Sequence, residues 1–313
     1  MSNRIDISFI LPAKNEADYI DACLSEIEQQ ITYTSLNCEI IVVDNNSSDE
    51  TSAISNRHKC EVIKSYSIAP SIVRNEGARK AKGRIFCFVD ADCVLTAGWL
   101  DRINHAFEDE SIGAFGGPHV PPDNSNWLIR TWYPKDLKNI EIDYGKLPGS
   151  NFSIRASIFK KLRGFDEKLI SAEDEDLSRR VVGIGFKSFF STQHQIIHLA
   201  YPDSFLRLFK QQIWHGSSQF EANGLTGDKL LLLTFGWVAL IPVMIFFYVL
   251  KSGVIWLWII VLVTPILISL NKLKYEKKPK YIRFILKSYP IAFIFLSGRA
   301  YGLIKELVTK LFK

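Results

Sequence analysis

The sequence predicts an α/β domain with a doubly wound, mostly parallel sheet, followed by an interfacial helix and a transmembrane helical hairpin. Two observations support this. Short apolar segments alternate with amphipathic segments through about the first ninety residues. Two long uncharged apolar runs occur late in the chain of 313 residues. The first pattern is typical of a parallel sheet covered by helices on both faces, and the second of segments that cross a bilayer.

Four apolar runs have the length and composition of buried strands: 7–11, 39–43, 60–65 and 84–89. Helical segments separate them. Residues 16–30 place Ile20, Cys23, Leu24 and Ile27 on one helical face, a second helix extends to about residue 58, and a third covers 70–83. This third helix is expected to begin at Pro70 and to end at Gly83, because proline suits the first helical turn and glycine suits the residue after the last. Alternation of this kind predicts parallel strands.

Polar residues follow the predicted strands at their carboxyl ends, where ligands bind in sheets of this type. They are residues 12–16, Asp44, and the pair Asp90 and Asp92. Two carboxylates held this close repel each other, so a cation is expected between them. Carboxylate oxygens favour Mg²⁺ or Mn²⁺. No glycine-rich phosphate loop follows the first strand, so such a metal would have to meet the charge of a phosphorylated ligand.

A second acidic cluster, residues 173–176, opens a predicted helix later in the chain. The helix dipole stabilises carboxylates at this position, so the composition of the cluster allows a purely structural explanation. Between the two clusters, residues 118–150 are rich in Pro, Asn and Trp and lack clear periodicity. We expect this section to face the substrate.

The carboxyl-terminal region predicts attachment to a membrane. Two runs, about 230–250 and 254–271, are each long enough to cross a bilayer as a helix. From Lys251 onward there are 12 Lys and Arg against 2 Asp and Glu, and the basic block 271–287 is expected on the cytoplasmic side. The segment 288–308 fits either a third crossing or a helix lying in the interface.

Seven motifs, in this order, resemble those of the family 2 glycosyltransferases of the GT-A fold. The resemblance covers most of residues 7–220. The motifs are PAKNE (12–16), VVDNNSSDET (42–51), RNEGARKAKG (74–83), VDAD (89–92), GSNFSIR (149–155), GFDE (164–167) and EDEDLSRR (173–180).

The resemblance implies a site for a nucleotide-sugar donor. It implies that the base and ribose lie against Pro12, Asn15, Glu16 and Asp44. It further implies that Arg74 approaches the nucleotide or its phosphates, and that Asp90 is shared between the ribose and a Mn²⁺ or Mg²⁺ ion. Asp92 is the expected direct ligand of this metal. His198 stands where many relatives carry a histidine that reaches the metal or the diphosphate.

The resemblance also gives the second acidic cluster a chemical role. In inverting members the aspartate of an ED pair is the catalytic base, and this position is Asp174 here. The base must take a hydroxyl proton from the acceptor as the anomeric carbon is attacked. Glu173 and Asn151 are expected on the acceptor side of the same site.

One departure bears on the kind of reaction. Processive members carry a QxxRW signature, whereas this chain has QQIWHG at 211–216, with no arginine and tryptophan in register. Processive polymerisation is therefore not expected. The stretch 203–220 is instead expected to be an amphipathic helix on the membrane surface.

These expectations define the predicted enzyme and its parts. Residues 1–202 form the catalytic domain, with a nucleotide-sugar half to about 117 and an acceptor half from about 118; residues 203–229 form the interface helix and linker, and 230–313 the membrane region. The predicted enzyme is a multi-pass protein of the cytoplasmic membrane whose catalytic domain faces the cytoplasm.

The predicted reaction transfers one sugar from a nucleotide-diphosphate donor, UDP-linked by expectation, to a hydroxyl of a lipid-linked saccharide during cell-surface polysaccharide or glycolipid synthesis. Nucleic acid is not expected as a partner. Two alternatives stay open: a polyprenyl-phosphate glycosyltransferase, and a non-catalytic membrane scaffold that binds nucleotide sugars.

Overall fold

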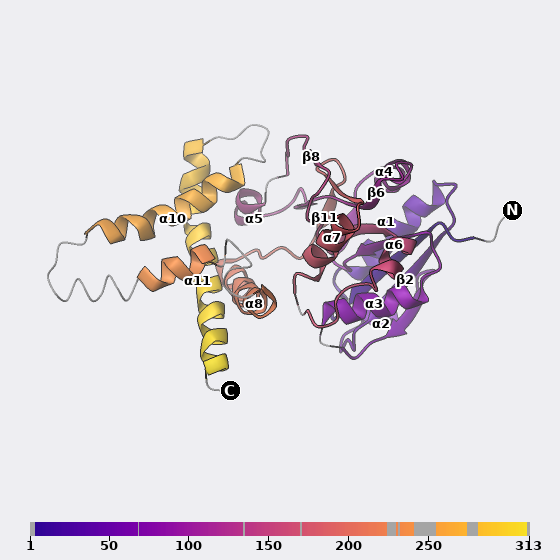
Figure 1. Ribbon diagram of the computed structural model, residues 1–313, viewed down its shortest axis with the longest axis horizontal. Helices are drawn as coiled ribbons and strands as arrows, with labels where there is room; N and C mark the ends of the chain where they lie inside the picture. The colour runs from indigo at the N-terminus through magenta and orange to yellow at the C-terminus, as the bar shows by residue number, and fades with distance from the viewer. Residues whose placement is uncertain are drawn as a thin grey trace. The chain divides into compact units, whose positions relative to one another are not determined.

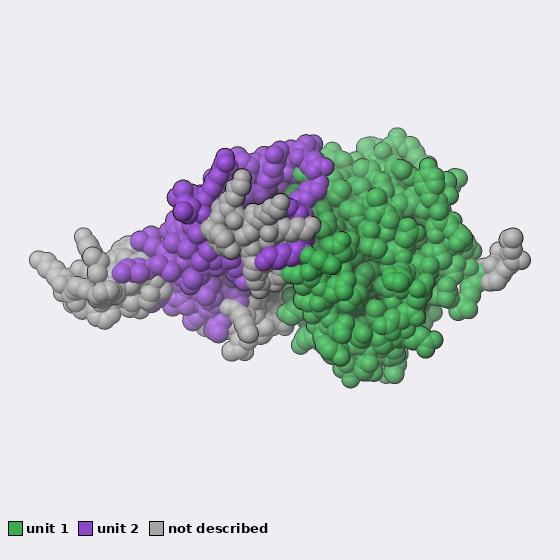
Figure 2. Space-filling view, turned by 90° about the horizontal axis from the view of Figure 1, so that it is seen from above, with its two compact units in different colours: residues 1–122, 139–200 green, residues 123–138, 201–313 purple. Residues whose placement is uncertain are grey.

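The computed structural model describes residues 4–67, 69–133, 135–169, 171–223, 230, 232–240, 255–273 and 281–311. The chain divides into two compact units, coloured green and purple in Figure 2. Unit 1 comprises residues 1–122 and 139–200, and unit 2 comprises residues 123–138 and 201–313.

Unit 1 is built on an eight-stranded sheet in the order β3-β2-β1-β4-β9-β6-β10-β8 (Figure 1). Its strands are β1 (Ile7–Ala13), β2 (Cys38–Asp44), β3 (Glu61–Lys64), β4 (Ile85–Val89), β6 (Ile112–Gly116), β8 (Glu141–Ile142), β9 (Asn151–Arg155) and β10 (Lys187–Ser191). The first four are the predicted strands, and they pair in parallel. Strand β9 runs antiparallel to both β4 and β6, and β8 runs antiparallel to β10. The sheet is therefore mixed, which corrects the predicted mostly parallel arrangement for its second half.

Helices cover both faces of this sheet. They are α1 (Ile20–Thr32), α2 (Thr51–Ser55), α3 (Pro70–Lys80), α4 (Trp99–Ala106), α6 (Ala156–Lys161) and α7 (Glu173–Gly183). Because alternate residues of a strand point to opposite faces, Phe9 joins one apolar core and Ile10 joins the other. The first core includes side chains of α1 and α4, and the second includes side chains of α3, α6 and α7. Helices are found where 16–30 and 70–83 were predicted, and α3 begins at Pro70 as expected. It ends at Lys80, before the predicted end at Gly83, because Ala81 is already extended, and the second helix is also shorter than predicted.

A second, three-stranded sheet was not predicted. It has the order β5-β11-β7, formed by β5 (Cys93–Leu95), β11 (Ile196–His198) and β7 (His119–Val120). Strand β11 is antiparallel to β5 and parallel to β7, so segments far apart in the sequence meet beside Asp92. His198 is the last residue of β11.

Unit 2 is helical. It contains α5 (Trp127–Trp132), α8 (Phe205–Asn223), α10 (Ile255–Leu273) and α11 (Tyr281–Leu311), and residues 232–240 are also helical. Helices α8 and α11 approach closely at glycines. A Cβ added to Gly216 would lie 2.3 Å from the carbonyl oxygen of Arg299, and one added to Gly302 would lie 2.1 Å from that of Ile213. Only residues without a side chain allow the two backbones to come this near.

The predicted transmembrane hairpin is not found in the described residues, because none of the helices they form is long and apolar enough to cross a membrane. Thr264, Pro265 and Ser269 interrupt the apolar sequence of α10, which covers most of the second predicted crossing. Residues 241–254, with the turn of the predicted hairpin, lie outside the described residues, as do 274–280 of the basic block. The segment 288–308 belongs to α11, and the predicted helix at 203–220 corresponds to α8.

Candidate active site

The loops that follow β1 and β2 are tied together by the predicted nucleotide residues. Ala13, which directly follows Pro12, pairs with Asp44 at the ends of these parallel strands. Asn15 has a left-handed backbone (φ 56°), and its amide oxygen accepts a hydrogen bond from the backbone N–H of Ser48 at 2.8 Å. The side chain of Asp44 is buried and accepts from the N–H of Ser47 at 3.0 Å. Pro12, Asn15 and Asp44 therefore gather at the carboxyl edge of the sheet.

Glu16 lies in the negative field of the aspartate pair. Burial, and then the charges of Asp92 and Asp90, raise the pKa of its carboxyl group to about 8. Its backbone N–H donates to the hydroxyl of Thr51 at 2.7 Å. The structure thus brings Glu16 and the two aspartates together, although they come from different loops.

Arg74 links the two acidic clusters. Its guanidinium is buried, donating to Asp90 at 2.8 Å and to Glu173 at 2.5 Å. Asp90 follows β4, Glu173 opens α7, and Arg74 lies in the middle of α3. The charges of Asp90 and Glu173 outweigh the effect of burial and raise the pKa of Arg74 above its ordinary range. This arginine was predicted to approach the nucleotide; the structure places it between the two clusters.

Asp92 faces His198 across the small sheet. Its carboxylate lies 3.3 Å from the imidazole Nε2, because Cys93 and His198 are paired in the register of β5 and β11. One ligand atom each of Asp92, Cys93 and His198 falls within 4.8 Å of the others. Burial raises the pKa of Asp92, so a cation here would offset the penalty of keeping its carboxylate charged. A carboxylate and an imidazole brought together in this way fit a divalent cation, with Asp90 nearby.

Asp174 occupies the start of α7, next to Glu173. Its carboxylate accepts from the N–H of Gly149 at 2.7 Å and from that of Glu175 at 2.8 Å. Burial and then the charge of Glu173 raise its pKa to about 6. A Cβ added to Gly149 would lie 3.2 Å from the Arg74 guanidinium and 3.4 Å from the Asp174 carboxylate. The glycine therefore leaves room for both the arginine and the aspartate close to one backbone position.

Asn151 is placed in the interior. Its side-chain amide donates to the carbonyls of His194 and Gly117 at 2.8 and 3.2 Å, and its oxygen accepts from the Trp99 indole at 3.1 Å. The residue is fully buried. The structure therefore shows these polar groups holding neighbouring segments in place beneath the site.

Two residues near the metal candidates were missed in the sequence. His119 forms a hydrogen bond with the hydroxyl of Ser150, and its ring lies edge-on to that of His198 with centroids 5.6 Å apart. Burial lowers the pKa of His119 to about 4. Ser150 stands inside the GSN motif, which offered a signal, whereas His119 belongs to a two-residue strand with no periodicity. His194, by contrast, is buried between the rings of Trp99 and Phe115, at centroid distances of 4.6 and 4.3 Å.

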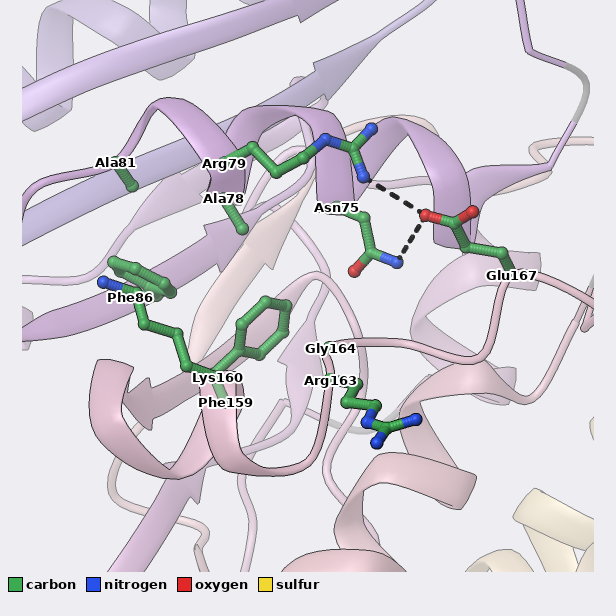
Figure 3. A pocket seen from close by; sticks show the side chains of 10 residues that line it. All are labelled: Asn75, Ala78, Arg79, Ala81, Phe86, Phe159, Lys160, Arg163, Gly164 and Glu167. Carbon is green, nitrogen blue, oxygen red and sulfur yellow. Dashed lines mark hydrogen bonds and ion pairs between the residues drawn. The ribbon is translucent and has the colours of Figure 1, made fainter.

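A cavity of about 320 Å³ is lined by residues of α3 and α6, with Phe86 and Phe159 in its wall (Figure 3). Glu167 accepts from Asn75 at 3.0 Å and from Arg79 at 3.3 Å, as the dashed lines show. The amide oxygen of Asn75 also accepts from the N–H of Phe165. Hydrogen bonds between the RNEG and GFDE motifs thus connect α3 to the turn before α7. None of the predicted site residues lines this cavity.

Residues 8–163 match the family model described as glycosyl transferase family 2. The chain carries a domain of glycosyl transferase family 2. It is 26% identical over 227 residues to the glycosyltransferase AglE of Haloferax volcanii, a match that covers 69% of this chain and 73% of that protein.

A second relative matches along nearly its whole length. It is the dolichyl N-acetyl-alpha-D-glucosaminyl phosphate 3-beta-D-2,3-diacetamido-2,3-dideoxy-beta-D-glucuronosyltransferase of Methanococcus voltae, with 25% identity over 330 residues, 96% of this chain and 97% of that protein.

The fold is similar to that of the mannosyltransferase PcManGT from Pyrobaculum calidifontis, solved in complex with GDP-Man and Mn²⁺. The TM-score is 0.65 with 16% identity, over 99% of this chain and 89% of that one. The predicted GT-A fold and the predicted family are confirmed.

Proposed function

We propose that this family 2 glycosyltransferase transfers one sugar, with inversion, from a nucleotide-diphosphate sugar to a hydroxyl of a lipid-linked saccharide. The observation that supports this most strongly is the bridge made by Arg74. It connects Asp90, on the donor side, to Glu173, beside the candidate base. One buried cation therefore fixes the spacing between the two ends of the proposed reaction.

Asp174 is the proposed catalytic base. A general base works best when its pKa is near the operating pH, and a pKa of about 6 keeps this carboxylate mostly ionised at neutral pH while making it a stronger base than an ordinary aspartate. The two N–H groups of Gly149 and Glu175 orient the carboxylate without neutralising it. Its proposed role is to accept the proton of the acceptor hydroxyl.

The proposed donor site lies at the carboxyl edge of the sheet. Pro12, Asn15, Glu16 and Asp44 line the base and ribose, and Asp92, Asp90 and His198 hold Mn²⁺ or Mg²⁺. When bound, such an ion supplies positive charge to the departing diphosphate. Arg74 acts by positioning Asp90 and Glu173. The Mn²⁺ in the mannosyltransferase from Pyrobaculum calidifontis supports the choice of metal.

We place the reaction at the cytoplasmic face of a membrane, within residues 1–202, and propose that unit 2 provides the attachment. Unit 2 carries 18 Lys and Arg against 7 Asp and Glu. Large apolar side chains on α8, α10 and α11 are exposed, among them Leu206, Trp214, Leu267 and Tyr301. Apolar residues combined with net positive charge favour anionic lipid surfaces. The name of the Methanococcus voltae relative, which contains a dolichyl-linked sugar phosphate, supports a lipid-linked acceptor.

The polyprenyl-phosphate alternative is disfavoured by the placement of Asp174. An acceptor that is already an ionised phosphate needs no general base, whereas this carboxylate is oriented and its pKa raised. The scaffold alternative predicts no transfer to any acceptor, so an activity assay separates it from the proposal.

The proposed donor site is tested by thermal shift with UDP, GDP, dTDP and CMP, each with and without Mn²⁺. We expect one nucleotide diphosphate to raise the melting temperature, only when Mn²⁺ is present. Asp92→Ala should abolish this shift. Asp101→Ala, which removes an exposed aspartate on α4, should leave it unchanged. Absence of a shift with every nucleotide would contradict the proposed donor site.

A further inference from the structure

Unit 2 holds two cationic side chains and a histidine that the proposed reaction does not use. Lys272 comes from α10, Arg299 from α11 and His215 from α8. Arg299 is buried, whereas Lys272 and His215 are half-buried. Three helices of unit 2 thus contribute these nitrogen groups.

Lys272 rests on aromatic rings. Its ammonium lies 4.9 Å from the ring centroid of Trp132 and 5.5 Å from that of Tyr133, both from the α5 segment. In the described part of the chain, no carboxylate pairs with this ammonium. Burial, and then the charge of Arg299, lower the pKa of Lys272 to about 8. The ammonium is therefore mostly protonated at neutral pH, although its surroundings disfavour the charge.

Arg299 is held in a fixed position. Its Nε donates to the amide oxygen of Gln212 at 2.9 Å, and its guanidinium lies 4.8 Å from the ring centroid of Phe295. The close approach of Gly216 fixes the backbone of Arg299 against α8. The same positive charge contributes to lowering the pKa of His215 to about 4, after burial as the main cause. The guanidinium is thus held against Gln212 of α8 and the ring of Phe295.

These features suit an anion that carries an apolar chain. A phosphate placed near Lys272 and Arg299 would offset the repulsion between the two cations. The half-buried ring of Tyr133 provides a surface for the carbon atoms next to the phosphate, and the fully buried ring of Trp132 packs against Lys272. Exposed apolar side chains on the same helices, such as Leu267 and Leu270 on α10, offer further contact to an aliphatic chain.

We propose that Lys272 and Arg299 form a binding site for the phosphate of a lipid, with Tyr133 as its aromatic wall. This inference rests on the proposed function for its biological source, the lipid-linked acceptor. Its chemistry applies equally to the phosphate of a bilayer headgroup.

Binding of farnesyl phosphate and of inorganic phosphate to the purified full chain tests this site by calorimetry. We expect Lys272→Gln to weaken farnesyl phosphate binding by about tenfold or more, the usual effect of losing a charged hydrogen-bond donor. Lys272→Arg should retain binding within about threefold, because it keeps the charge. Lys210→Gln is the matched control, since it removes an exposed lysine from α8, and should change the affinity by less than about twofold. Equal affinity in all four proteins would overturn the proposal.

A second measurement uses the unaltered protein, in case Lys272→Gln fails to fold. Farnesyl phosphate should slow the acetylation of Lys272 by acetic anhydride, read by mass spectrometry, and leave that of Lys210 unchanged. Equal rates with and without farnesyl phosphate would overturn the proposal.

Vesicles distinguish the two sources of phosphate. Phosphatidylcholine vesicles are prepared with polyprenyl phosphate or with phosphatidylglycerol. If Lys272→Gln weakens binding only to the vesicles with polyprenyl phosphate, the site is assigned to the acceptor carrier. If it weakens binding to both kinds of vesicle, the site is assigned to lipid headgroups in general. If it weakens binding to neither, the proposal is overturned.

Nucleotide binding measured on the same preparation separates this inference from the proposed function. If no nucleotide binds while farnesyl phosphate binding depends on Lys272, the proposed function fails and the phosphate site stands. If a nucleotide binds and Lys272→Gln does not change the affinity for farnesyl phosphate, the phosphate site alone fails.

Discussion

Arg74 and Glu173 form a buried ion pair of 2.5 Å that joins the middle of α3 to the first residue of α7. The second guanidinium arm reaches Asp90 at 2.8 Å. The arginine thereby neutralises a carboxylate from each acidic cluster, and the geometry of both clusters depends on it.

Loss of Arg74 should destabilise unit 1. Arg74→Ala leaves Glu173 buried without its partner, and breaking such a pair typically costs about 3–5 kcal/mol. We expect a decrease of this size in the free energy of unfolding measured in urea. Arg79→Ala is the control on the same helix, because its largely exposed ion pair with Glu167 should contribute less than about 1 kcal/mol. Similar losses in both variants would show that the Arg74 bridge does not hold the clusters together.

The raised pKa of Asp174 should make stability depend on pH. Its pKa of about 6 in the folded state exceeds the ordinary aspartate value of 3.8, so the folded chain binds this proton more tightly than the unfolded chain. The resulting stabilisation is present below about pH 4 and is lost as the pH rises through about 6; it amounts to on the order of 3 kcal/mol. Asp174→Asn resembles the protonated form and removes this dependence.

Urea unfolding at several pH values checks this sign. Relative to Asp174→Asn, the unaltered protein should become less stable between pH 4 and 7. Parallel stability curves for the two proteins would contradict a raised pKa at Asp174.

Removal of His198 should weaken metal binding directly. His198→Ala leaves Asp92 without the imidazole that lies 3.3 Å away. Calorimetric titration with Mn²⁺ should show an affinity lower by about tenfold or more. His105→Ala, which removes an exposed histidine from α4, should bind Mn²⁺ as the unaltered chain does. An unchanged affinity in His198→Ala would exclude this histidine as a ligand.

Much of unit 1 could be predicted from sequence because its signals are local. The strands β1, β2 and β4 are continuous apolar runs, and α3 is marked by a proline at its start. The convergence of Asp44, Asp90 and Asp92 on one edge follows from parallel pairing alone.

Other features depend on contacts between segments far apart in the sequence. Strand β9 inserts antiparallel between β4 and β6, and no local pattern reveals its direction. The two-residue strand that carries His119 has no periodicity, so its meeting with His198 could not be predicted. For Arg74 the sequence gives a helix position, whereas its two partners come from the loop after β4 and from the start of α7.

The hairpin prediction shows a different limit of sequence reasoning. Hydropathy measures how apolar a run is, but it does not measure how helices pack against one another. In the described part of unit 2, α11 packs along α8 and α10 and buries Leu296 and Ala300, residues of the segment that could be either a crossing or an interfacial helix.

The transfer rate of Asp174→Asn, measured beside its affinity for the donor, tests the central claim most directly. The assay follows radiolabelled sugar from the donor identified by thermal shift into a lipid extract. We expect turnover to fall by about 10²–10⁴-fold, because the acceptor hydroxyl loses its base, while donor affinity changes less than about twofold. Glu175→Gln, in the same cluster, should transfer at nearly the unaltered rate. Full turnover in Asp174→Asn would contradict the account.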